Sequence, residues 1–232
     1  MDLINDIVLD VKIAMLQEVQ AEITEKGRRC GVFPGDVWNE DVKSTVEGVV
    51  NTLGGLDVMV SNAAPKSSRC YAYSHLIDTI EQWDRTLAIN TRGAFLCYQY
   101  AAKQMIKQGR GGRIIGCSSS AGKSGNDIAV WGDQIGYPGL DPGTLVLGNF
   151  GITVNAYAPG AVDTEMSRLT TLQQRNMEEV IKLSVARSAV DYVGQPEDVT
   201  GLVSYLASKE ARYMTGTSTS SGRMYLTFMC WL

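Results

Sequence analysis

The chain has 232 residues, 44% of them hydrophobic, which is enough to bury one domain core but too little for two comfortable domains. Its formal net charge is −4 and no run of five like charges occurs, so nothing in the composition favours binding to nucleic acid or to an anionic membrane. No apolar stretch approaches the roughly 20 residues of a membrane-spanning helix, and no basic segment followed by an apolar run opens the chain. We therefore expect one cytoplasmic domain over residues 1–232.

The cysteines indicate neither a metal site nor a disulfide framework. Their number is odd, no two have Cys-x-x-Cys spacing, and no histidine lies where it would complete a zinc site. We expect reduced, mostly buried thiols at Cys30, Cys70, Cys97, Cys117 and Cys230.

Short apolar runs alternate with helical patterns along the chain, which is typical of βαβ units and a parallel α/β sheet. A first strand is predicted at 3–7, followed by a helix that Gly27 closes, and a second strand at 30–34. Asn39 is predicted to cap the next helix, which ends at Gly54. A strand at 56–60 precedes a long helical stretch from about 80 to 107, strands at 113–117 and 152–156 follow, and Pro196 opens the last helix.

Short motifs follow these elements in order. They are Gly35-Asp36-Val37, Ser61-Asn62-Ala63-Ala64, Asn90-Thr91-Arg92-Gly93, the Ser-x-Ala-Gly pattern at Ser119, and Pro159-Gly160-Ala161-Val162-Asp163-Thr164. Taken alone, each has an ordinary structural interpretation: Asn62 as a turn residue, Asp36 as a turn cap, and Ser119 as one of three consecutive serines that can cap. The order and spacing of the whole set favour a functional interpretation.

This set resembles the short-chain dehydrogenase/reductase family over most of the chain. The resemblance implies a Rossmann-like, doubly wound parallel sheet, a nicotinamide cofactor and a small carbonyl or alcohol substrate. It implies that Ser119 orients the substrate oxygen and that Asn90 holds a water of the proton relay. The cofactor-binding positions it implies are Asp36 and Val37 at the adenine, Asn62, Ala63 and Ala64 after the third strand, and Pro159, Gly160, Val162 and Thr164 beside the nicotinamide and pyrophosphate.

Two features depart from the family pattern. The first strand and its Gly-rich turn, which brings backbone N–H groups to the pyrophosphate, are missing, so that about 30 residues would have to precede Met1. Asp6 then stands where the family carries an acidic residue at the end of the second strand. A carboxylate there repels a 2′-phosphate and favours NAD over NADP, although Asp6 is also compatible with an exposed turn aspartate.

The second departure lies between Asn126 and Leu147, where the family would carry the catalytic Tyr-x-x-x-Lys. Tyr137 is followed four places later by Asp141, and the glycines and prolines of this stretch disfavour a long helix. The segment 130–135 can be encoded so that a shift of one base reads Tyr-Gly-Ala-Thr-Lys. We therefore infer a frameshift or misplaced splice junction, and we expect little or no activity from the chain as written.

The motifs look most like those of diacetyl/acetoin reductases and butanediol dehydrogenases, while relatives that act on 3-oxoacyl groups or sugar alcohols stay open. An intact family member is expected to be a homo-oligomer. A non-catalytic binding subunit and the product of a defective gene remain as alternatives.

Overall fold

The computed structural model describes residues 6–10, 12–64, 79–120, 144–172, 182, 185–186 and 188–222. Cys70, Cys230 and the part of the aberrant segment up to residue 143 lie outside these residues. Among the described residues, no helix is long and apolar enough to cross a membrane.

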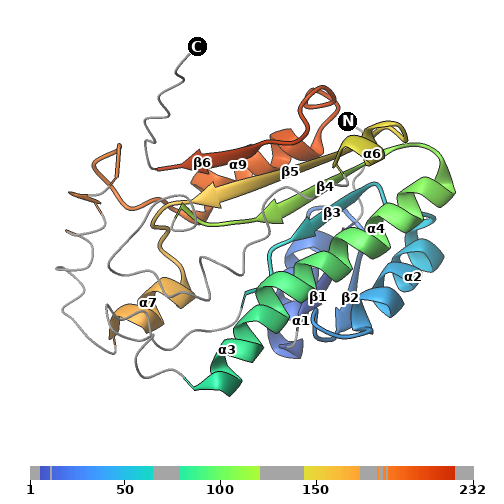
Figure 1. Cartoon of the computed structure of the whole chain (residues 1–232). Helices are drawn as coiled ribbons and strands as arrows, with labels where there is room; N and C mark the ends of the chain where they lie inside the picture. The colour runs from blue at the N-terminus through green and yellow to red at the C-terminus, as the bar shows by residue number, and fades with distance from the viewer. Residues whose placement is uncertain are drawn as a thin grey trace, which may run out of the picture.

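A βαβ unit opens the described chain (Figure 1). β1 (Asp6–Asp10) and β2 (Cys30–Pro34) pair in parallel as a two-stranded sheet, and α1 (Ile13–Glu25) connects them. Gly27 follows the end of α1 with φ 73°, a left-handed conformation that favours glycine, as the sequence predicted.

A second parallel sheet is built from the remaining strands, in the order β3-β4-β5-β6. Its strands are β3 (Val58–Ser61), β4 (Gly112–Cys117), β5 (Ile152–Pro159) and β6 (Ser218–Ser221). The other described helices are α2 (Asp41–Leu53), α3 (Ile80–Leu87), the π-helix η2 (Ala88–Gly93), α4 (Ala94–Gln108), α6 (Thr144–Gly148), α7 (Glu165–Leu172) and α9 (Pro196–Ala207). The pattern of alternating strands and helices therefore predicted the α/β class correctly.

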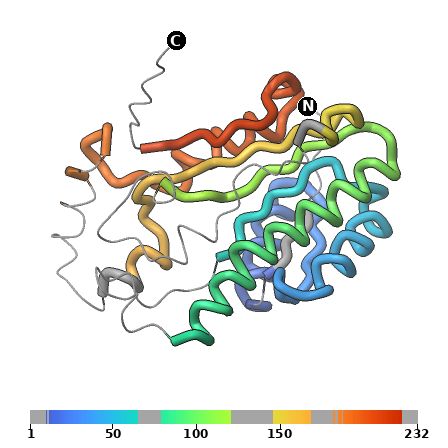
Figure 2. The backbone as a smooth tube through the Cα atoms, in the orientation of Figure 1, coloured from blue at the N-terminus to red at the C-terminus, as the bar shows by residue number. Residues whose placement is uncertain are grey.

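The long helical stretch before β4 is continuous but not uniform. Figure 2 shows α3, η2 and α4 as one rod in front of the sheet. Thr79 caps its start, since the Thr79 hydroxyl accepts a hydrogen bond from Gln82 N and the Gln82 side chain accepts one from Thr79 N. The π-helix in the middle widens one turn, a feature that often accompanies functional sites.

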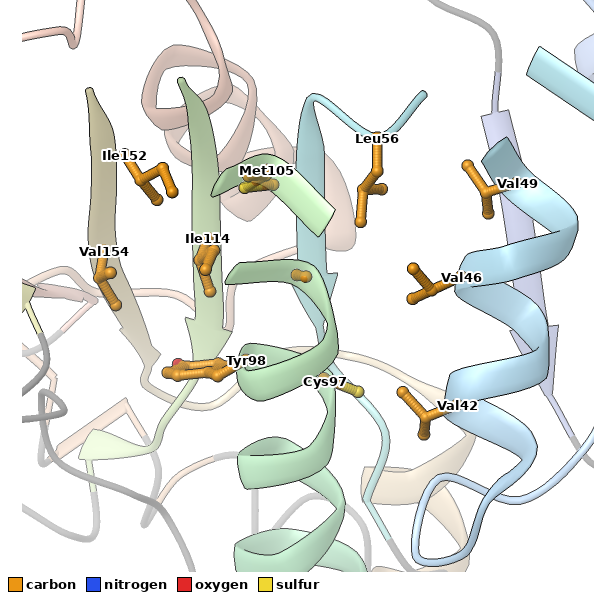
Figure 3. Packing of buried hydrophobic residues seen from close by; sticks show 11 residues of the cluster. Val42, Val46, Val49, Leu56, Cys97, Tyr98, Met105, Ile114, Ile152 and Val154 are labelled. Atoms are coloured by element: carbon orange, nitrogen blue, oxygen red, sulfur yellow. The ribbon is translucent and has the colours of Figure 1, made fainter. Parts of the chain in front are cut away.

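One face of the sheet is covered by α2 and α4. Figure 3 shows three valines of α2 pointing toward Leu56 and α4, while Met105 and Tyr98 of α4 lie against β4 and β5. These residues belong to one apolar cluster, whose fully buried members include Met105 and Ile114, both 0% exposed. This cluster joins β3, β4 and β5 to α2 and α4.

The opposite face packs against α9. Ile115 of β4 and Leu206 of α9 are both 0% exposed and belong to one apolar cluster with Tyr157 of β5. Because Ile114 and Ile115 point to opposite faces, β4 is buried on both sides, as its apolar composition predicts.

Two local predictions are wrong. The first strand, described over Asp6–Asp10, ends at Asp10 and not at residue 7, so Asp6 does not stand at its end. The N-cap of α2 is Glu40, while the Asn39 side chain accepts a hydrogen bond from Asp41 N at 2.8 Å. The strand at 30–34 and the helix opening at Pro196 are confirmed.

Candidate functional site

The carboxyl ends of the strands collect the predicted residues at one edge of the sheet. Asn62 follows β3 directly, Ser119 lies two residues beyond β4, and Gly160 follows the end of β5. The strands are parallel and in register, with Cys117 opposite Tyr157, so their ends meet at one edge. Ligands of open parallel sheets bind at this edge.

Tyr157 was not anticipated from the sequence, where it is one residue of an apolar run. Its hydroxyl donates a hydrogen bond of 2.5 Å to Asn62 Oδ1, and the residue is only 5% exposed. Ser118 N donates to the Tyr157 carbonyl oxygen at 2.7 Å. Tyr157 therefore ties the segments after β3 and β4 to β5.

Asn90 occupies an unusual position inside η2. It is 3% exposed, and neither its amide nitrogen nor its amide oxygen has a hydrogen-bond partner in the described part of the chain. Leaving such a buried group unpaired costs about 1–3 kcal/mol of folding free energy. We therefore expect a water or another polar group to bind the Asn90 amide.

Asp36 and Val37 lie in the turn after β2. Val37 packs against η2 closely enough that a Cβ on Gly93 would lie 2.8 Å from Val37 Cγ2. Asp36 N donates to Asp41 Oδ2 at 2.9 Å, so the turn is fixed by the start of α2. The structure thus brings Val37 to the helix that carries Asn90, and the turn at Asp36 is held through its backbone N–H.

The loop after β5 is held by the last strand. Gly160 N donates to the Ser221 carbonyl oxygen at 2.9 Å, and a Cβ on Gly160 would lie 3.0 Å from that oxygen. Val162 forms an isolated parallel bridge with Gly194.

Thr164 precedes α7, and its hydroxyl accepts a hydrogen bond from Ser167 N at 3.3 Å. A small cavity of about 210 Å³ beside this loop is lined by residues that include Gly160, Val162 and Tyr192.

An ion pair joins the same loop to α7. Arg168 donates two hydrogen bonds to Asp163, of 2.7 and 2.9 Å. These bonds, with the positive charge of the guanidinium, lower the pKa of Asp163 below its ordinary value.

Asp6 does not stand at the predicted place. It begins β1, at the edge of the sheet opposite to the carboxyl ends. Asp10 ends the strand, and its carboxylate accepts a hydrogen bond from Lys12 N at 2.9 Å. The acidic residue at the carboxyl end of β1 is therefore Asp10, which the misplaced strand boundary concealed.

The described cysteines, Cys30, Cys97 and Cys117, are free thiols. Burial raises the pKa of the Cys97 thiol, and burial likewise raises the pKa of Cys117, which a hydrogen bond with Tyr157 lowers in part. Thiols of raised pKa are poor nucleophiles at neutral pH. Within the described residues, no cluster of three or more metal-ligating side chains occurs.

The chain does contain one Tyr-x-x-x-Lys spacing, at Tyr205 and Lys209, but it lies at the wrong end of the sheet. Arg113, at the start of β4, donates a hydrogen bond of 3.3 Å to the carbonyl oxygen of Ser208. The end of α9 therefore lies beside the amino ends of the strands, far from Ser119. The expected position of the catalytic pair, up to residue 143, lies outside the described residues.

Comparisons with known proteins agree with this arrangement. The family described as "short chain dehydrogenase" matches residues 4–130, and "Enoyl-(Acyl carrier protein) reductase" matches residues 144–221. A short-chain dehydrogenase/reductase of Hericium erinaceus is 42% identical over 92% of this chain and 82% of its own length. A diacetyl reductase ((S)-acetoin forming) of Staphylococcus epidermidis is more distant, 30% identical over 95% of this chain and 89% of its own length.

The fold has a matching relative among solved structures. The structure of an NAD⁺-bound xylitol dehydrogenase matches with a TM-score of 0.82 and 25% identity, covering 94% of this chain and 88% of that one. The parallel sheet, the polar edge and these similarities agree: the chain belongs to the short-chain dehydrogenase/reductase family.

Proposed function

We propose that this chain binds NAD in preference to NADP at the carboxyl edge of its sheet and that, as written, it turns over substrate slowly or not at all. Membership of the family makes the chain an NAD(P)-dependent oxidoreductase by class. The observations that carry the proposal are the gathering of Asn62, Ser119 and Gly160 at one edge and the buried amide of Asn90, which has no partner among the described residues.

The described residues fit the two ends of a dinucleotide better than its middle. Asp10, Asp36 and Val37 would border the adenosine, and the loop from Pro159 to Thr164 would border the nicotinamide. No strand in the described residues is followed by the three-glycine turn that cradles a pyrophosphate. When bound, the cofactor supplies hydride chemistry.

The chain's own groups can orient a substrate, but its sequence carries no Tyr-x-x-x-Lys between Asn126 and Leu147. Ser119 is half-buried beyond β4 and would hold a carbonyl or hydroxyl oxygen, and Asn90 would hold a water. General acid–base catalysis contributes typically about 10²- to 10⁴-fold, so the loss of Tyr-x-x-x-Lys would reduce turnover at least that much. Binding without turnover would favour the alternative function, a non-catalytic binding subunit.

The substrate we propose is a small vicinal diketone or hydroxyketone. The likeness to a diacetyl reductase supports it, while the likeness to a xylitol dehydrogenase keeps sugar alcohols as the competing class. Parallel assays of diacetyl and xylitol with a chain that carries a restored Tyr-x-x-x-Lys separate the two classes.

The division of the strands into two sheets supports the further proposal that one strand and its Gly-rich turn are lacking. Among the described strands, β1 pairs only with β2 and β3 pairs only with β4, so each has one edge without a partner in this part of the chain. A central parallel strand between them would complete a doubly wound sheet.

Fluorescence titration with NADH and NADPH tests the cofactor proposal. We expect NADH to bind more tightly than NADPH. We expect Asp10→Asn to narrow this ratio of the two dissociation constants by about tenfold, because the Asp10 carboxylate repels a 2′-phosphate. Asp57→Asn is the matched control, since Asp57 pairs with Arg110 before β3, at the other end of the sheet. Equal binding of both cofactors by the unsubstituted chain, or no effect of Asp10→Asn, would contradict the proposal.

A further inference from the structure

An ion pair connects the end of the first strand with the loop after β5. Lys12 Nζ lies 3.7 Å from Glu165 Oε2. Lys12 follows Asp10, the last residue of β1, and Glu165 is the first residue of α7. The pair therefore joins the segment that would border the adenosine to the segment that would border the nicotinamide.

The Lys12 side chain starts beside the carboxylate that we propose to disfavour NADP. Lys12 N donates a hydrogen bond of 2.9 Å to Asp10 Oδ1, so the two residues form one turn at the carboxyl end of β1. A carboxylate at this place repels a 2′-phosphate, whereas a basic side chain nearby accommodates one. The charges of Asp10 and Lys12 thus act in opposite directions on the choice between NAD and NADP.

The start of α7 holds Glu165 in place. Thr164 N donates a hydrogen bond of 2.9 Å to Ser167 Oγ, and this hydroxyl donates to the Thr164 carbonyl oxygen at 2.8 Å. Arg168 is bound to Asp163 through two hydrogen bonds. The guanidinium is thereby engaged within the loop, while the Glu165 carboxylate reaches the ammonium group that follows β1.

Removing this ion pair should change the local charge more than the stability of the fold. The side chains of Lys12 and Glu165 are 39% and 59% exposed. Ion pairs at such exposure contribute little to the free energy of folding, because solvent screens them. The carboxylate still reduces the attraction of the ammonium for a neighbouring phosphate, because the two opposite charges are adjacent. Without Glu165, Lys12 would present its full positive charge beside Asp10.

We propose that Glu165 determines cofactor specificity by neutralising Lys12. With the pair formed, the Asp10 carboxylate dominates at the 2′ position, and NAD is favoured over NADP. With Glu165 removed, the Lys12 ammonium would attract a 2′-phosphate and offset the repulsion by Asp10. This inference rests on the proposed cofactor site, but it assigns part of the preference to a residue of α7, across the site from the adenosine.

Glu165→Gln tests this role, because it removes the charge and keeps the size of the side chain. Fluorescence titrations of the parent chain and the variant give the dissociation constants of NADH and NADPH. We expect the ratio of the NADPH constant to the NADH constant to fall by about three- to fivefold, the change expected for the loss of one surface ion pair. The fall should shrink as the salt concentration rises, because salt screens the charge of Lys12.

Two further variants separate a role through Lys12 from a general effect of charge. Lys12→Met combined with Glu165→Gln should give a ratio within about twofold of that of Lys12→Met alone, since Glu165 then has no ammonium to neutralise. Asp57→Asn is the matched control, because it also removes one carboxylate from an ion pair, the pair with Arg110 ahead of β3. It should leave the ratio unchanged. Circular dichroism melts establish that every variant folds.

Three results of these titrations would overturn the proposal. They are an unchanged ratio in Glu165→Gln, the same fall when Lys12→Met is the background, and an equal fall in Asp57→Asn. A parent chain that binds both cofactors equally, or that prefers NADPH, would contradict the proposed preference for NAD. It would leave the role of Glu165 standing, because the change in the ratio measures that role.

A chain that binds neither cofactor would contradict the proposed function. Calorimetric titration with adenosine 2′,5′-bisphosphate and adenosine 5′-monophosphate then tests Glu165 separately, because neither ligand carries a nicotinamide. Glu165→Gln should tighten binding of the bisphosphate relative to the monophosphate by the same factor. An unchanged ratio, or no binding of either ligand, would overturn the inference.

Discussion

The hydroxyl of Tyr157 donates a 2.5 Å hydrogen bond to Oδ1 of Asn62, residues that lie 95 positions apart in the chain. This bond joins the end of β3 to β5 at the edge where the cofactor is proposed to bind. Because the Tyr157 hydroxyl occupies the amide oxygen, the Asn62 amide nitrogen is left to donate elsewhere.

Tyr157→Phe should destabilise the fold by about 1 kcal/mol, because it removes one partly buried hydrogen bond and leaves Asn62 Oδ1 without that donor. Urea unfolding followed by circular dichroism measures the free energy of unfolding. Tyr213→Phe is the control, since Tyr213 is 98% exposed. Equal stability of Tyr157→Phe and the unsubstituted chain would show that the bond contributes nothing.

Two glycine substitutions should have opposite effects. Gly93→Ala should destabilise by about 1–3 kcal/mol, because the added Cβ overlaps Val37, and Val37→Ala in the same chain should restore part of the loss. Gly201→Ala in α9 should stabilise by about 1 kcal/mol, since a Cβ there meets nothing within 4 Å and alanine favours helix. Thermal and urea unfolding compare the three variants. Destabilisation by both single alanines would contradict the packing described.

The ion pair between Arg168 and Asp163 predicts a pH dependence. Since the folded-state pKa of Asp163 is lowered, its contribution to stability is present above its ordinary pKa and is lost as pH falls through the folded-state pKa. Arg168→Met should therefore raise the pKa of Asp163 toward its ordinary value, measured by NMR titration of the carboxyl carbon. The difference in free energy of unfolding between Arg168→Met and the unsubstituted chain should vanish at pH values below the folded-state pKa of Asp163. An unchanged titration would mean that the pair does not persist in solution.

The sequence predicted those elements whose ends are determined by neighbouring residues, and it failed where contacts with distant segments determine them. The strand Cys30–Pro34 and the helix starting at Pro196 are delimited by their own residues, and both are confirmed. The end of the first strand was misplaced, because the apolar run Ile7-Val8-Leu9 continues past the predicted end and pairing with β2 extends as far as Asp10. That shift moved the acidic end of the strand from Asp6 to Asp10.

The candidate site shows the same division. The family resemblance assigned Asn62, Ser119 and Pro159 to the cofactor and substrate, and these residues stand at or just beyond the carboxyl ends of neighbouring parallel strands. The Tyr157–Asn62 bond and the π-helix around Asn90 arise from packing between distant segments, which no local pattern encodes. The described helix Thr144–Gly148 covers only the end of the aberrant segment, so the frameshift hypothesis stays a prediction that sequencing of the transcript decides.

Turnover by the purified chain is the most direct test of the central claim, that this family member lacks its proton-transferring pair. NADH oxidation is followed by absorbance with diacetyl or acetoin, and NAD⁺ reduction with butanediol, each with saturating cofactor. We expect no turnover above the uncatalysed rate in any of these assays, even where NADH titration shows binding. A kcat in the ordinary enzyme range, about 1–10³ s⁻¹, would contradict the account.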